Sequence, residues 1–127
     1  MKQLTVEWQR LVENGDTCDR CQVTGDILHD TIERLNRECQ ARGWEIRLTE
    51  TALGPESIAN SNRILVDGKP LETFLPGAKN ATNHCRSCSE MIGTQTQCRT
   101  LEWAGGSHET IPESLLRRAI CRVAACC

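Results

Sequence analysis

Two pairs of cysteines in this chain have the spacing of reactive or metal-binding thiols. Cys18 and Cys21 lie three positions apart in "TCDRC", and Cys85 and Cys88 repeat that spacing in "HCRSC". Two such thiols can form a redox dithiol, in which one thiolate attacks a disulfide and the other resolves the mixed disulfide. The same spacing also places two sulfur ligands around one metal ion. The spacing of each pair is therefore consistent with a redox dithiol and with two ligands of a metal site.

For the first pair, we expect an exposed site in which Cys18 is the nucleophile and Cys21 is the resolving thiol. This pair either exchanges disulfides or captures a soft metal or metalloid such as mercury or arsenic, because both activities use the same exposed geometry. Half of a structural zinc site and an inert turn are the alternatives.

The second pair belongs to a larger cluster with the spacing of a metal site. Cys85, Cys88 and Cys98 form a Cys-x2-Cys-x9-Cys pattern, and His84 is adjacent. Zinc takes four nitrogen or sulfur ligands, so His84 or a fourth thiol would complete the set. The surrounding polar segment, residues 69–97, has few apolar side chains and would gain stability from a bound ion. We expect a structural zinc site here, with a second redox pair or unliganded thiols as alternatives.

The two pairs are expected to form two separate sites. If the third strand runs antiparallel to the first, the chain leaves it at the edge opposite Cys18 and Cys21, and a strand of five or six residues spans about 17 to 20 Å. The segment 69–97 is nevertheless long enough to fold back.

The other four cysteines carry weaker signals. Cys39 falls on the apolar stripe of a helix, where a buried small side chain is expected, and Cys121 falls on the polar face of the last helix. Cys126 and Cys127 form a vicinal pair on an expected frayed terminus. Such a dithiol resembles the tail thiols with which mercuric reductases pass on a soft ion. The alternative is a tail without a function.

Composition restricts the class of protein. The 127 residues suit one domain, 1–127, and no stretch approaches the roughly 18 consecutive apolar residues of a membrane span. The net charge of -2 and pI of about 5.9 argue against a nucleic-acid partner. We expect a cytoplasmic protein. That compartment disfavours structural disulfides among the nine cysteines.

Hydrophobic periodicity predicts an α/β (α+β) fold with the order β-α-β-β-β-α. Period-2 alternation and helical stripes predict the following elements: strands at 4–11, 44–48, 63–68 and 98–103, and helices at 26–42 and 112–125. The first three elements should form a right-handed parallel crossover. The Cys-rich segment 69–97 is predicted to be an insertion between the third and fourth strands.

Several stretches together resemble a known family. "LTVEWQRLV", "TCDRC", "SNRILVDGKPLE", "HCRSC" and "CRTLEW" followed by "IPESL" are similar to small, uncharacterised prokaryotic thioredoxin-like proteins, the domain of unknown function 2703. The resemblance covers nearly the whole chain and implies a reduced thioredoxin-like fold. The chain departs from the thioredoxin pattern in two ways: Ser61 and Asn62 stand where thioredoxins have a cis-proline, and "QVTG" separates Cys21 from the clear helical pattern.

These observations lead to two hypotheses about function. In the first, the protein uses Cys18 and Cys21 for thiol-disulfide exchange or for handling soft metals, and the second cluster holds a structural zinc ion. Its partner is then a protein thiol or disulfide, or a soft metal ion. In the second, both cysteine pairs coordinate zinc in a non-enzymatic carrier or interaction module.

Overall fold

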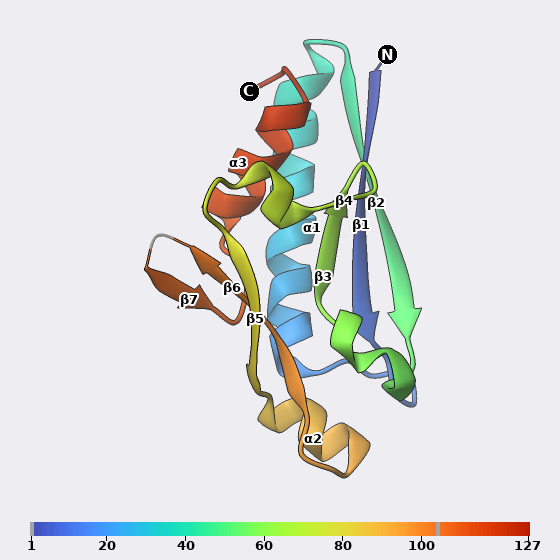
Figure 1. Ribbon diagram of the computed structural model, residues 1–127. Helices are drawn as coiled ribbons and strands as arrows, with labels where there is room; N and C mark the ends of the chain where they lie inside the picture. The colour runs from blue at the N-terminus through green and yellow to red at the C-terminus, as the bar shows by residue number, and fades with distance from the viewer. Residues whose placement is uncertain (1, 104) are drawn as a thin grey trace.

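The computed structural model describes residues 2–103 and 105–127, and it begins with a parallel crossover. Strand β1 (Lys2–Leu11) leads into helix α1 (Asp19–Gln40) and strand β2 (Trp44–Leu53). β1 and β2 pair in parallel from Lys2 opposite Trp44 to Leu11 opposite Leu53 (Figure 1). The predicted strand-helix-strand unit is confirmed.

A hairpin completes the first sheet. Helical turn η1 (Pro55–Asn60) leads to β3 (Arg63–Val66), which pairs antiparallel with β1, and β4 (Lys69–Pro70) pairs antiparallel with β3. Asp67 and Gly68 form the two-residue turn between them, both with positive φ (49° and 80°), the conformation that twisted hairpins prefer. The strand order is β2-β1-β3-β4.

A second sheet contains the predicted fourth strand. After helical turn η2 (Leu71–Phe74), strands β5 (Lys79–His84), β6 (Gln97–Trp103) and β7 (Gly106–His108) pair antiparallel in that order, with α2 (Arg86–Ile92) between β5 and β6. Residues 98–103 are thus a strand, as predicted, but they do not join the first sheet. Because the tight hairpin supplies β4 from within residues 69–97, the first sheet is complete before the chain reaches the second cysteine cluster.

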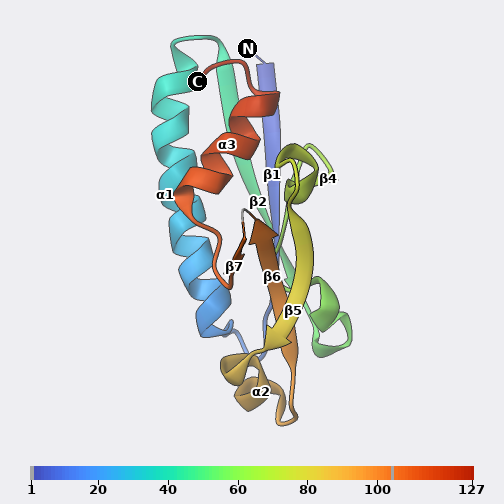
Figure 2. The ribbon, with the colours of Figure 1, turned by 60° about the vertical axis from the view of Figure 1, so that its left-hand side comes forward.

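The helices and the second sheet lie on the same side of the first sheet (Figures 1 and 2). Helix α3 (Glu113–Val123) packs against α1, with Leu116 and Ile120 fully buried. Leu4 and Val6 of β1 point into the same apolar core, as their period-2 alternation predicts. This core also contains all the cysteines of both thiol pairs.

Helix α1 begins earlier than the sequence indicates. We expected it from residue 26, but it starts at Asp19, directly after Cys18. Thr24 and Gly25 are weak helix formers, which obscured its first two turns. Gly25 is required there, because a Cβ atom would lie 2.3 Å from the Trp8 ring. None of the helices in the described ranges has the length and apolar character needed to cross a membrane.

Candidate metal centre

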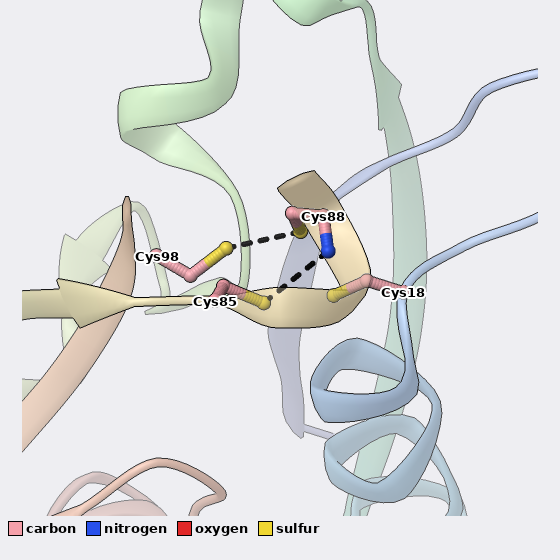
Figure 3. A group of neighbouring side chains, drawn as sticks. All are labelled: Cys18, Cys85, Cys88 and Cys98. Atoms are coloured by element: carbon pink, nitrogen blue, oxygen red, sulfur yellow. Dashed lines mark hydrogen bonds between the residues drawn. The ribbon is translucent and has the colours of Figure 1, made fainter. Parts of the chain in front are cut away.

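Four cysteine sulfurs from three segments of the chain meet in one buried group. Cys18 precedes α1, Cys85 and Cys88 lie at the start of α2, and Cys98 lies in β6. Their Sγ atoms all lie within 4.8 Å of one another, and all four side chains are buried (Figure 3). The expectation of two separate sites is wrong, because β5 returns the chain across the molecule to the start of α1. We call these four residues the four-cysteine centre.

Both thiol pairs adopt the same local structure. Cys18 is the N-cap of α1 and Cys85 is the N-cap of α2. The Cys18 Sγ accepts the backbone N–H of Cys21 at 3.4 Å, and the Cys85 Sγ accepts that of Cys88 at 3.5 Å. A sulfur that accepts a backbone N–H at a helix start is stabilised as a thiolate, the form that binds metals.

Strand pairing brings Cys98 to the second pair. Asn83 lies opposite Cys98 in the β5-β6 ladder, and the backbone N–H of Cys85 donates to Thr96 O at 2.9 Å. The Cys98 thiol donates to the Cys88 Sγ at 3.0 Å. The unit β5-α2-β6 therefore presents three of the four sulfurs, as the Cys-x2-Cys-x9-Cys spacing predicted.

Polar contacts attach the start of α1 to this unit. The Asp19 backbone N–H donates to Ser87 Oγ at 2.9 Å, and Arg20 donates to the carbonyl oxygen of His84 at 3.3 Å. Arg20 also pairs with Glu109 at 3.4 Å, and its second terminal nitrogen, Nη1, is buried without a protein partner. A largely buried cation therefore lies against the backbone of His84, the residue before Cys85, and it is paired with Glu109.

Proton sharing within the thiol group is uneven. The Cys21 thiol is the largest cause that holds the pKa of Cys18 far below its usual range, and the neighbouring Cys88 and Cys98 side chains act in the same direction. The same contacts with Cys18 raise the pKa values of Cys21, Cys88 and Cys98. Cys18 is thus the first of these residues to form a thiolate.

The first thiol pair is not an exposed dithiol. Cys18 and Cys21 both have 0% exposure, so the expectation of an open redox site is wrong on accessibility. The Cys21 sulfur lies outside the four-sulfur group and 3.4 Å from Ser61 Oγ. Among the described residues no peptide bond is cis, and Asn62, with φ of 62°, accepts a hydrogen bond from the Trp8 indole instead. The backbone facing Cys21 therefore differs from the cis-proline turn of thioredoxins.

Comparison with known proteins assigns the chain to a family. The family described as "Domain of unknown function (DUF2703)" matches residues 4–120. The chain belongs to this family. It is 31% identical over 104 residues to an uncharacterised protein of Archaeoglobus fulgidus, an alignment that covers 79% of this chain and 72% of that protein. No solved structure matches it.

The fourth member of the sulfur group in this DUF2703 chain is a thiol, which is one of the two alternatives that we left open beside His84. His84 is exposed, and its imidazole lies outside the four-sulfur group, whereas Cys85, Cys88 and Cys98 are together as predicted. Cys18 completes the set. The signal in the sequence was the ligand count: the second cluster supplies three thiols, zinc needs four ligands, and another thiol pair precedes α1.

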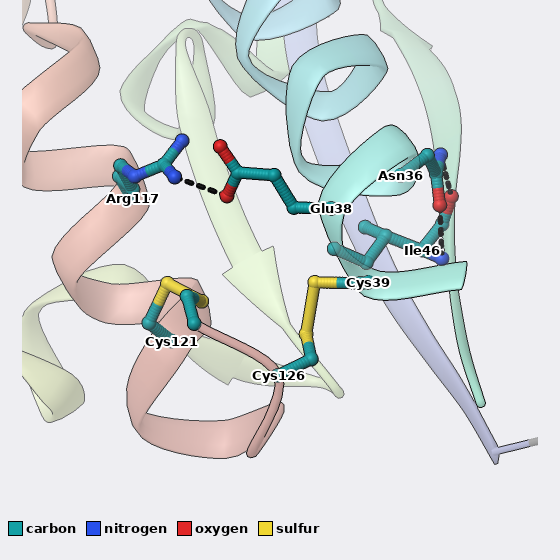
Figure 4. The surroundings of a disulfide bond; sticks show 8 residues. Asn36, Glu38, Cys39, Ile46, Arg117, Cys121 and Cys126 are labelled. Carbon is teal, nitrogen blue, oxygen red and sulfur yellow. Dashed lines mark hydrogen bonds and ion pairs between the residues drawn. A yellow bond between two sulfur atoms is a disulfide. The ribbon is translucent and has the colours of Figure 1, made fainter. Parts of the chain in front are cut away.

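The remaining cysteines of this DUF2703 chain form two disulfides. Cys39 pairs with Cys126, and Cys121 pairs with Cys127 (Figure 4). Cys39 is buried as predicted, but Cys126 is also buried, so the expected frayed tail is wrong there. Cys126 reaches Cys39 because α3 packs beside α1 and brings the C-terminal ends of both helices together.

Proposed function

We propose that this protein is a metal-binding module in which Cys18, Cys85, Cys88 and Cys98 hold one structural zinc ion. The convergence of four buried sulfurs from three segments supports this proposal most strongly. Tetrahedral zinc with Zn–S distances near 2.3 Å separates its ligand sulfurs by about 3.8 Å. The four sulfurs lie within 4.8 Å of one another, and the Cys88 and Cys98 sulfurs are 3.0 Å apart, so small shifts in both directions reach this geometry.

The ligand type favours zinc over harder cations. Four thiolates select soft or borderline ions, and a set of four protein ligands leaves no open position for a substrate. Four thiolates and Zn²⁺ together carry two negative charges. The N–H···S hydrogen bonds to Cys18 and Cys85 and the buried Arg20 offset that charge.

The ion would stabilise the second sheet. Four of the six residues of β5 are exposed, and the other two are half-buried. Apolar burial therefore contributes little to this strand. A metal ion shared between Cys18 and the β5-α2-β6 unit joins the second sheet to α1, and its binding free energy adds to folding free energy. The protein then acts as an interaction module with a structural ion rather than as an enzyme.

Thiol redox chemistry is the second candidate. Cys18 forms a thiolate first, and Cys21 is its neighbour, so an ion-free protein could exchange disulfides through this pair. The proposed fold is a single thioredoxin-like domain, 1–127. The sheet order β2-β1-β3-β4 and the thiol pair at the start of α1 support it. A cytoplasmic location is part of the proposal, because that compartment keeps the free cysteines of the four-cysteine centre reduced, although it disfavours the two disulfides at the other end of α1.

The decisive experiment compares two serine variants from the same Cys-x-x-Cys motif. Protein in which the Cys39–Cys126 and Cys121–Cys127 disulfides are intact should contain one zinc per chain by elemental analysis. Cys18→Ser should lose most of this zinc, whereas Cys21→Ser should retain it, because only Cys18 belongs to the four-sulfur group. Equal zinc content in both variants would refute the proposed site.

An insulin-reduction assay with thioredoxin reductase tests the redox alternative. Activity that is lost in both Cys18→Ser and Cys21→Ser, in protein without zinc, would favour the dithiol. No activity in either the zinc-loaded or the zinc-free protein would favour the metal-binding module.

A further inference from the structure

A second thiol group lies at the other end of α1. Cys39 is in the last turn of α1, and the sulfurs of Cys39, Cys126 and Cys127 lie within 4.8 Å of one another. Cys121, in the last turn of α3, is disulfide-bonded to Cys127, and Cys39 is bonded to Cys126. We call these four residues the distal cysteine group.

We propose that the distal cysteine group is a second, redox-gated site for a soft metal ion. In the reduced protein, the thiolates of Cys39, Cys126 and Cys127 bind the ion. In the oxidised protein, the two disulfides occupy all three sulfurs and close the site. Thiolate ligands select a soft cation such as Zn²⁺, Cd²⁺ or Cu⁺.

The scaffold of this site does not depend on its sulfurs. Arg117 pairs with Glu38 (Figure 4). Arg34 pairs with Glu113 at 2.9 Å, so two ion pairs join α1 and α3. Apolar residues of α3 also pack against the core shared with α1. When the disulfides are reduced, these contacts keep Cys39 close to the residues that follow α3. Reduction therefore leaves only the short tail beyond Val123 free to rearrange around an ion.

The helix ends favour a cation at this position. α1 ends at Gln40 and α3 ends at Val123, so the C-termini of both helices converge on the distal cysteine group. A helix C-terminus has a partial negative charge, which destabilises a bare thiolate and stabilises a bound cation. The local field thus favours metal-bound sulfur over a nucleophilic thiolate. The four-cysteine centre, at the N-terminus of α1, has the opposite field.

The chemical steps balance with a named reductant. A dithiol reductant transfers two electrons and two protons to each disulfide and itself becomes a disulfide. Two such exchanges convert Cys39–Cys126 and Cys121–Cys127 into four thiols. Binding of a divalent cation then releases three protons from Cys39, Cys126 and Cys127 and forms three metal–sulfur bonds. Reoxidation by a disulfide oxidant reverses the sequence and expels the ion.

The two thiol groups can be tested independently. Helix α1 has 22 residues, which at 1.5 Å per residue separates its ends by about 30 Å. A substitution in the distal cysteine group therefore leaves the four-cysteine centre untouched. A result that contradicts one proposed metal site therefore does not contradict the other.

The experiment counts cadmium ions per chain by thiolate-to-metal charge-transfer absorbance. Chain stripped of metal is reduced with a water-soluble phosphine, which becomes phosphine oxide with oxygen from water, and is then titrated with Cd²⁺. We expect two ions in reduced protein and one after the disulfides re-form. Ellman titration in denaturant, where the buried thiols are accessible, should detect nine thiols in the reduced protein and five in the oxidised protein, in which Cys18, Cys21, Cys85, Cys88 and Cys98 are free.

Serine variants assign each ion. The double variant C126S/C127S should bind one ion, and the ion retained at the four-cysteine centre shows that the protein is folded. The matched control is Cys121→Ser, which removes a thiol of the same group outside the three-ligand set, and it should still bind two ions when reduced. C88S/C98S should bind one ion at the distal cysteine group.

Three results would overturn the proposal. The first is an unchanged ion count in C126S/C127S, and the second is an equal count in reduced and oxidised protein. The third is loss of the second ion in Cys121→Ser. If C88S/C98S instead binds as many ions as the unsubstituted chain, the proposed function fails while the distal site stands.

Discussion

Cys18 and Cys85 occupy the same position in their helices, the N-cap, and their sulfur atoms lie within 4.8 Å of each other. Each accepts the backbone N–H of the cysteine three positions later. The two Cys-x-x-Cys motifs are therefore two copies of one local structure that face each other. They differ in the second thiol, because Cys88 joins the shared group whereas Cys21 points toward Ser61.

Removal of the metal should destabilise the second sheet more than the first. The proposed ion joins Cys18 to the β5-α2-β6 unit, while β1 and β2 form a ten-residue parallel ladder without it. A strong chelator should lower the melting temperature, and a loss of about 3 kcal/mol corresponds to roughly 10 °C in a chain of this size. Amide exchange should accelerate in β5 and β6 and change little in β1.

Acidification should have the same effect as the chelator, because protons compete with the metal for thiolates. If amide exchange accelerated equally in both sheets, or did not accelerate in either, the ion would not join the second sheet to α1.

Arg20→Gln should weaken metal binding by about tenfold, because it removes a buried positive charge beside a centre with two negative charges. Arg86→Gln is the matched control: it removes an arginine next to Cys85 whose side chain is 88% exposed and screened by water. Competition with a chromophoric chelator measures both affinities. Equal weakening in both variants would assign the effect to overall charge rather than to the buried guanidinium.

Much of the first sheet could be predicted from the sequence. The alternation of Leu4 and Val6 with polar neighbours, and the apolar stripe of α1 that includes Leu28 and Leu35, gave the crossover and its parallel pairing. Such patterns are local, because the side chains that point into the core recur at fixed intervals along one segment. The Asp67-Gly68 turn was also predicted from the sequence. However, the two residues after it form β4, where we expected no strand.

The four-cysteine centre could be predicted only in part. The spacing of Cys85, Cys88 and Cys98 gave three ligands, because they belong to one β-α-β unit. The approach of Cys18 depends on how far β5 carries the chain back across the molecule, which no local pattern encodes. The Cys39–Cys126 disulfide also could not be predicted from a local pattern, because it follows from the packing of α3 beside α1.

Substitutions at Asn62 should separate a hydrogen-bond effect from a backbone effect. Its side chain accepts from the Trp8 indole at 3.0 Å and donates to Thr24 Oγ1 at 3.1 Å, and its φ is 62°. Asn62→Gly keeps the backbone conformation and leaves a buried indole N–H unpaired, at a cost of about 1 to 3 kcal/mol. Asn62→Ala should cost roughly 1 kcal/mol more, because a Cβ disfavours positive φ.

Urea unfolding followed by tryptophan fluorescence measures both Asn62 variants. Equal stabilities of the two would show that the left-handed backbone at this position contributes nothing.

Gly25→Ala should destabilise the protein, although alanine favours a helix interior by about 1 kcal/mol over glycine. The added Cβ would lie 2.3 Å from the Trp8 ring, so either the ring or α1 must move. Overpacking of this kind costs about 1 to 3 kcal/mol. Val23→Ala, at a helix position with 46% exposure, is the control and should change stability by less than about 0.5 kcal/mol.

The fluorescence of Trp8 provides a second measurement for Gly25→Ala. The Trp8 indole donates a hydrogen bond to Asn62, so displacement of the ring should shift the tryptophan fluorescence of the folded protein. A stabilised Gly25→Ala variant would mean that the close contact between α1 and β1 does not exist in solution.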